Sequence, residues 1–264
     1  MTIYKAVLFG LLFLFSSTLW ASEDERKGLE LSLGIEMEKT IGIYIHDGFE
    51  TTKGNPIDYI LPVSLSYEIS PGIITTFGVE LVHQNHDAGD NTGFDRPYFY
   101  LEYIQSKFQV GSFIRCHLPF GSKGIAYDAE GYNEPQVDLG LIYHPEFENF
   151  SIESKLEYMY TFLCKDKEKQ DEVNFSLEPE LQITEVLNMF LGLEYTYYFP
   201  LYEDSEKIEE STAWGITVTP GFSYEINDQL AVDLSVSYVV AGNAAKNGEA
   251  NASWAIGTEF ILAF

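Results

Sequence analysis

The sequence predicts an all-β fold, a closed antiparallel β-barrel of twelve strands that crosses a membrane. Three observations support this prediction. Apolar and polar residues alternate over successive segments, the connections between segments are alternately short and long, and aromatic residues gather near both ends of the segments. Alternation with a period of two is the pattern of a strand whose two faces meet different surroundings. The mature region shows no long amphipathic helical period that could bury its apolar residues instead.

Alternation divides the chain into twelve segments, although ten or fourteen strands are also possible. An even number is expected for a single-chain barrel whose two ends lie on the same side of the membrane. Three prolines, Pro62, Pro179 and Pro220, fall inside segments, where we expect β-bulges to accommodate them. The predicted strands are 29–45, 57–69, 73–83, 97–104, 108–118, 137–143, 150–162, 173–183, 189–199, 212–226, 230–240 and 254–264.

The connections and the aromatic residues fit the same barrel. Short turns at 70–72, 105–107, 145–149, 185–188 and 227–229 alternate with longer polar loops at 47–56, 84–96, 119–136, 164–172, 200–211 and 241–250. Outward aromatic residues near the two strand ends form two girdles, as in a membrane barrel but not in a soluble β-sandwich. The girdle prediction includes Tyr67, Tyr143, Tyr197, Trp214, Tyr224, Tyr238, Trp254 and Phe260.

The two ends of the chain carry targeting signals. Residues 1–21 combine Lys5, an apolar run and Ala21 before a cleavage point, which predicts a cleaved signal peptide and leaves 22–264 as one barrel domain. The final segment, ending in Phe260, Leu262 and Phe264, resembles the C-terminal strand of bacterial outer-membrane β-barrels. That resemblance implies short periplasmic turns, longer extracellular loops and a location in the outer membrane of a Gram-negative cell. It also implies contact with lipid and lipopolysaccharide, and with periplasmic chaperones and the barrel assembly machinery that reads a terminal Phe.

The face opposite the apolar one must line the interior, because every backbone group in a membrane barrel has to be paired within a closed sheet. This face is rich in carboxylates, and its permanent cations are Arg115 and Lys155. So many charges require water and mobile cations inside the barrel. The predicted lumen carboxylates are Glu30, Glu36, Glu38, Asp58, Glu68, Glu80, Glu102, Asp138, Glu153, Glu157, Glu178, Glu180, Glu194, Glu225, Asp233 and Glu259.

Twelve tilted strands leave a bore on the order of 10 Å. Glycines on the inward face, such as Gly78, Gly140 and Gly221, are expected to make the wall thin and the bore wider. Rings of Asp and Glu favour positive solutes, so the sequence predicts a porin-like channel that passes cations or small neutral or cationic solutes by passive diffusion. By size and strand number the chain resembles the small monomeric twelve-stranded porins that take up acidic sugars. Its wall has the opposite charge, which makes acidic sugars poor candidates.

Other function classes weigh less. A net charge of −26 disfavours nucleic acid as a partner. A closed barrel with a structural or surface adhesion role is the runner-up to the channel. A lipid-modifying barrel enzyme comes third, because His83 precedes a position that such enzymes fill with a serine nucleophile. Asn85 stands at that position and cannot form an acyl intermediate. We expect no cofactor, and His46, His117 and His144 are too dispersed to predict a metal site.

Two further features stay open in the sequence. Cys116 and Cys164 could form a disulfide in an oxidising compartment or remain independent, with Cys116 facing lipid. Inward tyrosines Tyr98, Tyr100 and Tyr198, together with Tyr44, could either stack against a solute or pack the wall.

Overall fold

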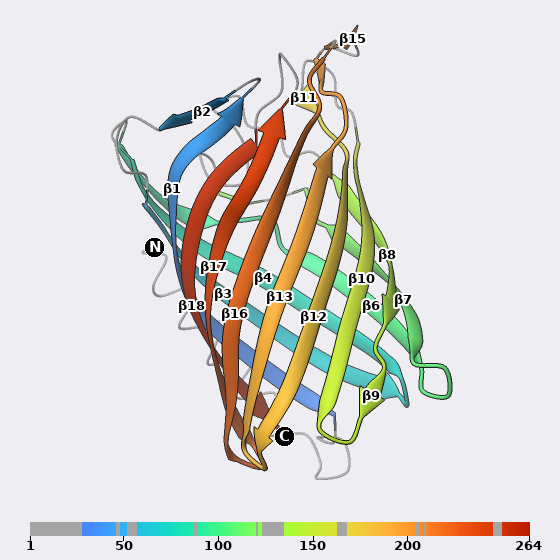
Figure 1. The fold of residues 1–264 in the computed structure, drawn as a ribbon. Helices are drawn as coiled ribbons and strands as arrows, with labels where there is room; N and C mark the ends of the chain where they lie inside the picture. Colours follow the sequence, from blue (N-terminus) through green and yellow to red (C-terminus); the bar gives the residue numbers. More distant parts are fainter. Residues whose placement is uncertain are drawn as a thin grey trace.

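The computed structural model shows a tilted β-barrel (Figure 1). No helix in the described part of the chain is long and apolar enough to span a membrane. The predicted signal peptide, His46 and Cys164 lie outside the described residues. The structure describes residues 28–45, 48–51, 57–86, 89–119, 121–122, 135–162, 168–203, 206–208, 210–244 and 250–264.

Twelve strands form the wall, as predicted, and each pairs antiparallel with the wall strands before and after it in the chain. The last strand pairs with the first, which closes the ring. The wall strands are β1 (Leu29–Ile45), β3 (Ile57–Ser70), β4 (Ile73–His86), β6 (Tyr98–Gln105), β7 (Val110–His117), β8 (Gln136–Tyr143), β10 (Phe150–Thr161), β12 (Glu172–Thr184), β13 (Leu187–Tyr198), β16 (Ala213–Asn227), β17 (Leu230–Ala244) and β18 (Ala250–Ala263).

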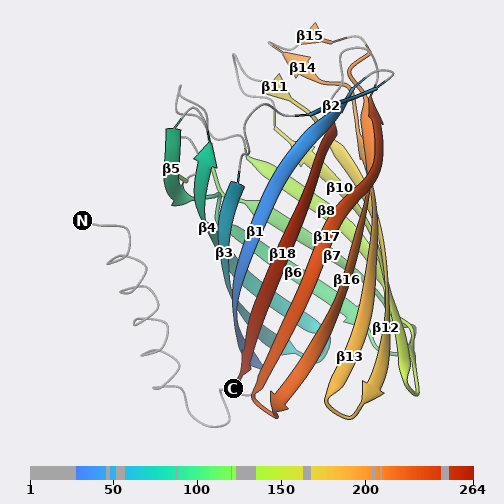
Figure 2. The ribbon, with the colours of Figure 1, turned by 60° about the vertical axis from the view of Figure 1, so that its left-hand side comes forward.

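Shorter strands extend the barrel at both ends. β2 (Gly48–Thr51) pairs with β1, and β5 (Gly89–Phe94) pairs with the upper part of β4. Beyond them, β11 (Glu168–Lys169), β14 (Tyr202–Glu203) and β15 (Glu206–Lys207) form a separate small sheet. These elements lie at the end of the barrel opposite the C-terminus, which we call the loop end (Figure 2). The other end, with the short turns and β9 (Glu146–Phe147), is the turn end.

Several wall strands run further toward the loop end than predicted. β4 continues to His86, β17 to Ala244, and β18 begins at Ala250 instead of Trp254. Apolar alternation marks only the part of a strand that meets lipid, whereas backbone pairing can continue beyond it without that pattern. On β1 the pairing with β18 shifts register between Thr40 and Gly42, which is the mark of a β-bulge in this strand.

The outward face of the barrel is a continuous apolar belt. On β8, Leu141 is 59% exposed while its neighbour Ile142 is 1% exposed, so consecutive side chains meet different surroundings. The same contrast appears on β7, where Ile114 is exposed and Phe113 is buried in the wall interior. A globular protein would not leave so many large apolar side chains outside. This belt is the surface that lipid would cover.

The three strand prolines do not produce the bulges that we predicted. Beside Pro62, the pairs between β1 and β3 run from Leu33–Val63 to Glu36–Ile60 without a change of register. The pairing omits two positions there, while Pro62 remains opposite Glu80 on its other side. Pro179 and Pro220 show the same one-sided gap. A strand residue directs its N–H to one neighbour only, so a missing donor interrupts one ladder and leaves the register intact.

Candidate permeation site

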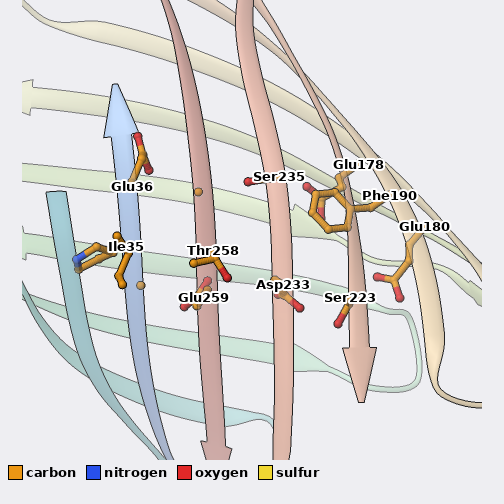
Figure 3. A pocket seen from close by; sticks show the side chains of 13 residues that line it. Ile35, Glu36, Glu178, Glu180, Phe190, Ser223, Asp233, Ser235, Thr258 and Glu259 are labelled. Atoms are coloured by element: carbon orange, nitrogen blue, oxygen red, sulfur yellow. The ribbon is translucent and has the colours of Figure 1, made fainter. Parts of the chain in front are cut away.

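The lumen contains a cavity of about 370 Å³ lined by carboxylates from several strands (Figure 3). Glu36 comes from β1, Glu178 and Glu180 from β12, Asp233 from β17 and Glu259 from β18. Consecutive wall strands bring these residues together, because each places alternate side chains on the inward face. The cavity lining includes no lysine or arginine. Its uncompensated negative charge can attract cations from solution.

A second cavity, of about 280 Å³, adjoins the first through Glu178, which lines both. Its other charged lining residues are Glu153, Lys155, Glu157 and Glu194. Lys155 Nζ lies 2.6 Å from Glu153 Oε1 on the same strand, so this cation is paired locally. The second cavity thus lies between the carboxylates of the first cavity and the ion-paired residues of β10.

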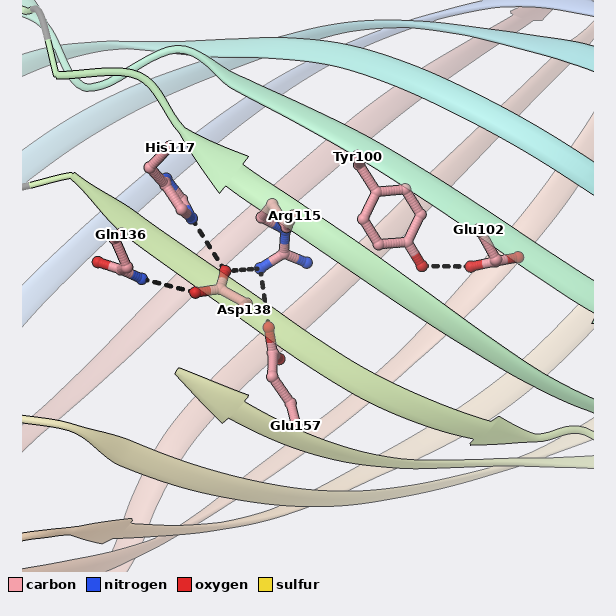
Figure 4. A network of polar contacts seen from close by, with 7 residues as sticks. All are labelled: Tyr100, Glu102, Arg115, His117, Gln136, Asp138 and Glu157. Carbon is pink, nitrogen blue, oxygen red and sulfur yellow. Dashed lines mark hydrogen bonds and ion pairs between the residues drawn. The ribbon is translucent and has the colours of Figure 1, made fainter. Parts of the chain in front are cut away.

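A different arrangement surrounds Arg115 on β7 (Figure 4). Its Nη1 atom lies 3.4 Å from Asp138 Oδ2 and 3.3 Å from Glu157 Oε1. Asp138 on β8 is fully buried and also contacts His117 Nε2 at 3.0 Å and Gln136 Nε2 at 3.0 Å. The buried carboxylate is therefore satisfied by several donors, as burial of a charge requires.

Aromatic rings complete this cluster. The Arg115 guanidinium lies 5.7 Å from the Tyr98 ring, 5.5 Å from the Tyr100 ring and 6.0 Å from the Phe113 ring, which are cation–π distances. The Tyr100 hydroxyl donates a hydrogen bond to Glu102 on the same strand. We call the residues Tyr98, Tyr100, Glu102, Phe113, Arg115, His117, Gln136, Asp138 and Glu157 the Arg115 cluster. Its rings pack against the wall and its carboxylates are paired.

Three of the inward glycines, Gly78, Gly140 and Gly221, do not thin the wall as predicted, because neighbouring rings lie over them, whereas no ring covers Gly215 or Gly257. A Cβ atom at Gly140 would meet the Phe113 ring at 2.2 Å, and one at Gly221 would meet the Phe190 ring at 2.2 Å. Gly78 receives the Tyr98 ring in the same way. These glycines provide space for rings on adjacent strands to lie flat against the sheet. An inward ring opposite an inward glycine was the signal in the sequence that could have revealed this packing.

Further contacts of the predicted lumen carboxylates are formed within the wall. Glu68 accepts a hydrogen bond from the Gly72 backbone at the turn end, and Glu38 and Glu80 lie on the inward sides of β1 and β4. Glu194 accepts a hydrogen bond from the Thr196 hydroxyl, and Glu259 accepts one from Ser32. The structure thus brings Glu36, Glu178, Glu180, Asp233 and Glu259 together, and separately Asp138 and Glu157 around Arg115.

The cross-strand partners of the predicted girdle residues place them in two groups, one toward the loop end and one toward the turn end. Tyr197 is opposite Trp214, and Tyr238 is opposite Trp254, toward the loop end. Tyr67 is opposite Leu29, Tyr143 is opposite Val110, Tyr224 is opposite Leu187 and Phe260 is opposite Val232, toward the turn end. On β18, Phe260 and Leu262 lie on the outward face. The Phe264 backbone N–H donates to the Leu29 carbonyl at 2.9 Å, which ties the chain end to β1.

The structure also places the residues that bear on catalysis, a disulfide and metal binding. His83 Nδ1 lies 2.7 Å from the hydroxyl of Thr92 on β5, a contact that the sequence does not predict because Thr92 falls in a predicted loop. Cys116 has a free thiol. Among the described residues, no group of three or more His, Cys, Asp or Glu side chains is placed to hold a metal ion.

Comparison with known proteins identifies the class of fold. No protein-family model matches the sequence, and no curated protein matches it. Among solved structures, an outer-membrane channel from Pseudomonas putida F1 superposes with a TM-score of 0.76 at 13% identity, over 92% of this chain and 99% of that one. The β domain of the Bordetella autotransporter BrkA gives 0.54 at 14% identity, over 90% and 99% of the two chains. The Pseudomonas putida toluene transporter TodX gives 0.52 at 11% identity, over 93% and 91%.

These likenesses, at such low identity, establish the fold alone. The chain forms a closed, twelve-stranded antiparallel barrel, a fold that it shares with the outer-membrane channel from Pseudomonas putida F1.

Proposed function

We propose that this protein is an outer-membrane channel that lets cations and small neutral or cationic solutes diffuse through an acidic lumen. The observation that carries the proposal is the 370 Å³ cavity inside the barrel, which is lined by carboxylates from β1, β12, β17 and β18 and by no basic side chain. Carboxylates lining a water-filled passage lower the electrostatic barrier for positive solutes and raise it for anions.

The structural neighbours support a channel role, without indicating which solute passes. Two of them are named as an outer-membrane channel and a toluene transporter. An apolar solute such as toluene does not suit the carboxylate-lined cavities of this barrel, since it would displace water from ionised groups without pairing them. The lumen chemistry therefore favours charged or polar cargo for this chain.

The same proposal sets the orientation and the partners. The loop end faces the exterior, the turn end faces the periplasm, and lipid with lipopolysaccharide covers the apolar belt. A cleaved signal peptide at 1–21 and recognition of the terminal Phe by periplasmic chaperones and the barrel assembly machinery would bring the chain there. Nucleic acid has no role, because the chain is strongly acidic.

Solute flux into liposomes tests the channel directly. Purified, refolded protein is reconstituted and the liposomes are diluted into isotonic arginine or, in parallel, isotonic glutamate, two probes of similar size and opposite net charge. The channel predicts faster swelling in arginine than in glutamate. Equal rates, or faster entry of glutamate, would contradict the cation preference.

A closed barrel that acts through its loops, as an adhesin or an envelope stabiliser, is the competing function from another class. Single-channel recording separates the two, because an open lumen gives stable current steps and a closed one gives no current at any voltage. A silent protein that is shown to be folded would favour the closed barrel.

A further inference from the structure

The lumen charges are distributed unequally around the barrel. We define the acidic face as the inward sides of β12, β13, β16, β17, β18 and β1, and the neutralised face as the inward sides of β6, β7, β8 and β10. The strands β12, β13, β16, β17 and β18 contain no lysine or arginine, and Lys39 of β1 lies on the outward side. Both lumen cations, Arg115 and Lys155, belong to the neutralised face.

Every carboxylate that the neutralised face presents has a partner. Arg115 contacts Asp138 and Glu157, Lys155 contacts Glu153, and the Tyr100 hydroxyl donates to Glu102. A mobile cation that approached these groups would compete with a donor already in place. The rings of Tyr98, Tyr100 and Phe113 further fill this side of the wall.

The acidic face has the opposite character. Within the described chain, no basic side chain contacts Glu36, Glu178, Glu180 or Asp233. The 370 Å³ cavity lies against this face and is bounded by these same groups (Figure 3). One oxygen of Asp233 is buried and accepts no hydrogen bond from the described protein. Charge compensation on this face must come from solution.

We propose that permeant cations follow the acidic face, and that Glu36, Glu178 and Asp233 set the selectivity, while the Arg115 cluster is a charge-neutral wall beside the path. This inference deepens the proposed function and rests on it. Cation preference, which the proposed function assigns to the whole lumen, is thereby assigned to one side of the bore. The inference also assigns the favoured solute a positive charge that it can present laterally to a row of carboxylates.

Two matched triple variants test the inference. The first, Glu36→Gln with Glu178→Gln and Asp233→Asn, removes three negative charges from the acidic face. The second, Glu102→Gln with Glu153→Gln and Glu157→Gln, removes three from the neutralised face. The cation-to-anion permeability ratio is measured for each in planar bilayers under potassium chloride gradients, at about 0.1 M and at about 1 M salt, where the Debye lengths are roughly 10 Å and 3 Å.

At the lower salt concentration both triple variants should lose cation preference. The Debye length is then similar to the width of the bore, so charges on every side of the wall act on a passing ion. At the higher concentration only charges that line the path still act. The acidic-face variant should then show a ratio reduced by about threefold or more, and the neutralised-face variant a ratio within about a factor of 1.5 of the parent.

Equal losses at high salt, or a larger loss in the neutralised-face variant, would overturn the inference. If either triple variant fails to fold, the single variants Glu178→Gln and Glu102→Gln decide in the same way. The parent protein distinguishes this failure from that of the proposed function. A parent that shows no cation preference refutes the channel proposal itself, whereas a selective parent with equal variants refutes only the path.

Discussion

At the scale of single residues, the Arg115 cluster shows most clearly what the sequence could and could not predict. Alternation assigned Arg115, Asp138 and Glu157 to the lumen, but a period of two gives the face of a residue and not its height. The contacts depend on the register between β7, β8 and β10, which pairs Arg115 with Asp138. Register between neighbouring strands is fixed by the whole ladder, so the ion pairs required the structure.

Replacing Arg115 with methionine should destabilise the barrel. Asp138 is fully buried and would keep His117 and Gln136 but lose its permanent cation. We expect a loss of about 1–3 kcal/mol in the free energy of unfolding, measured by urea titration of the refolded protein. Lys155→Met is the control, because that partly exposed pair contributes only about 0–1 kcal/mol. Equal losses in the two variants would show that Arg115 does not stabilise a buried charge.

The ring over Gly140 gives a second prediction at this scale. Gly140→Ala places a Cβ atom 2.2 Å from the Phe113 ring, and the overpacking should cost about 1–3 kcal/mol. Gly215→Ala is the control, since the nearest atom to its added Cβ is 4.0 Å away. Thermal unfolding of both variants checks this, and adding Phe113→Leu to Gly140→Ala should recover part of the loss. A Gly140→Ala barrel as stable as the Gly215→Ala barrel would contradict the close packing of the Phe113 ring on Gly140.

At the scale of elements, strand number and facing followed from the sequence, while strand ends and proline positions did not. β4, β17 and β18 continue toward the loop end after the apolar signal stops, because backbone pairing does not require an apolar face. At Pro62 the missing N–H affects one ladder only, so a gap on one side replaces the predicted bulge. The sequence does not show which neighbouring strand loses the hydrogen bond at the proline, because this depends on the register between the strands.

Two adjacent positions on β17 test which face of a strand meets lipid. Leu234 is exposed on the apolar belt, whereas Asp233 lines the lumen cavity. Leu234→Arg should therefore destabilise the protein in lipid by about 2–4 kcal/mol. Asp233→Arg should cost much less, because carboxylates of the cavity surround the new side chain. Unfolding in lipid vesicles measures both variants, and a larger loss for Asp233→Arg would show that the two faces have been assigned the wrong way round.

The seam between β18 and β1 gives a prediction about biogenesis. Phe264 donates a backbone hydrogen bond from its N–H to Leu29, and an alanine would keep that bond, so Phe264→Ala should leave the purified barrel able to refold. If the assembly machinery reads the terminal ring, the same variant should accumulate less in outer-membrane fractions of expressing cells. Normal membrane levels of the variant, with normal refolding, would rule out that role for Phe264.

At the scale of the whole molecule, the closed barrel was predictable, but the way carboxylates and cations are distributed around its interior was not. A count of charges on alternate residues gives the number that face the lumen, but not the side of the barrel on which each one lies. The unequal distribution appears only when the strands are placed around the ring, with Arg115 and Lys155 on one side and the cavity lined by Glu36, Glu178 and Asp233 on the other. The channel proposal depends on both facts, since an open and unpaired acidic surface is what a passing cation requires.

The reversal potential of the pure protein under a salt gradient measures directly whether the lumen prefers cations to anions. With potassium chloride tenfold more concentrated on one side of a planar bilayer, an acidic lumen should shift the zero-current voltage toward the equilibrium potential of potassium. A shift toward the equilibrium potential of chloride, or no shift while current flows, would contradict the account.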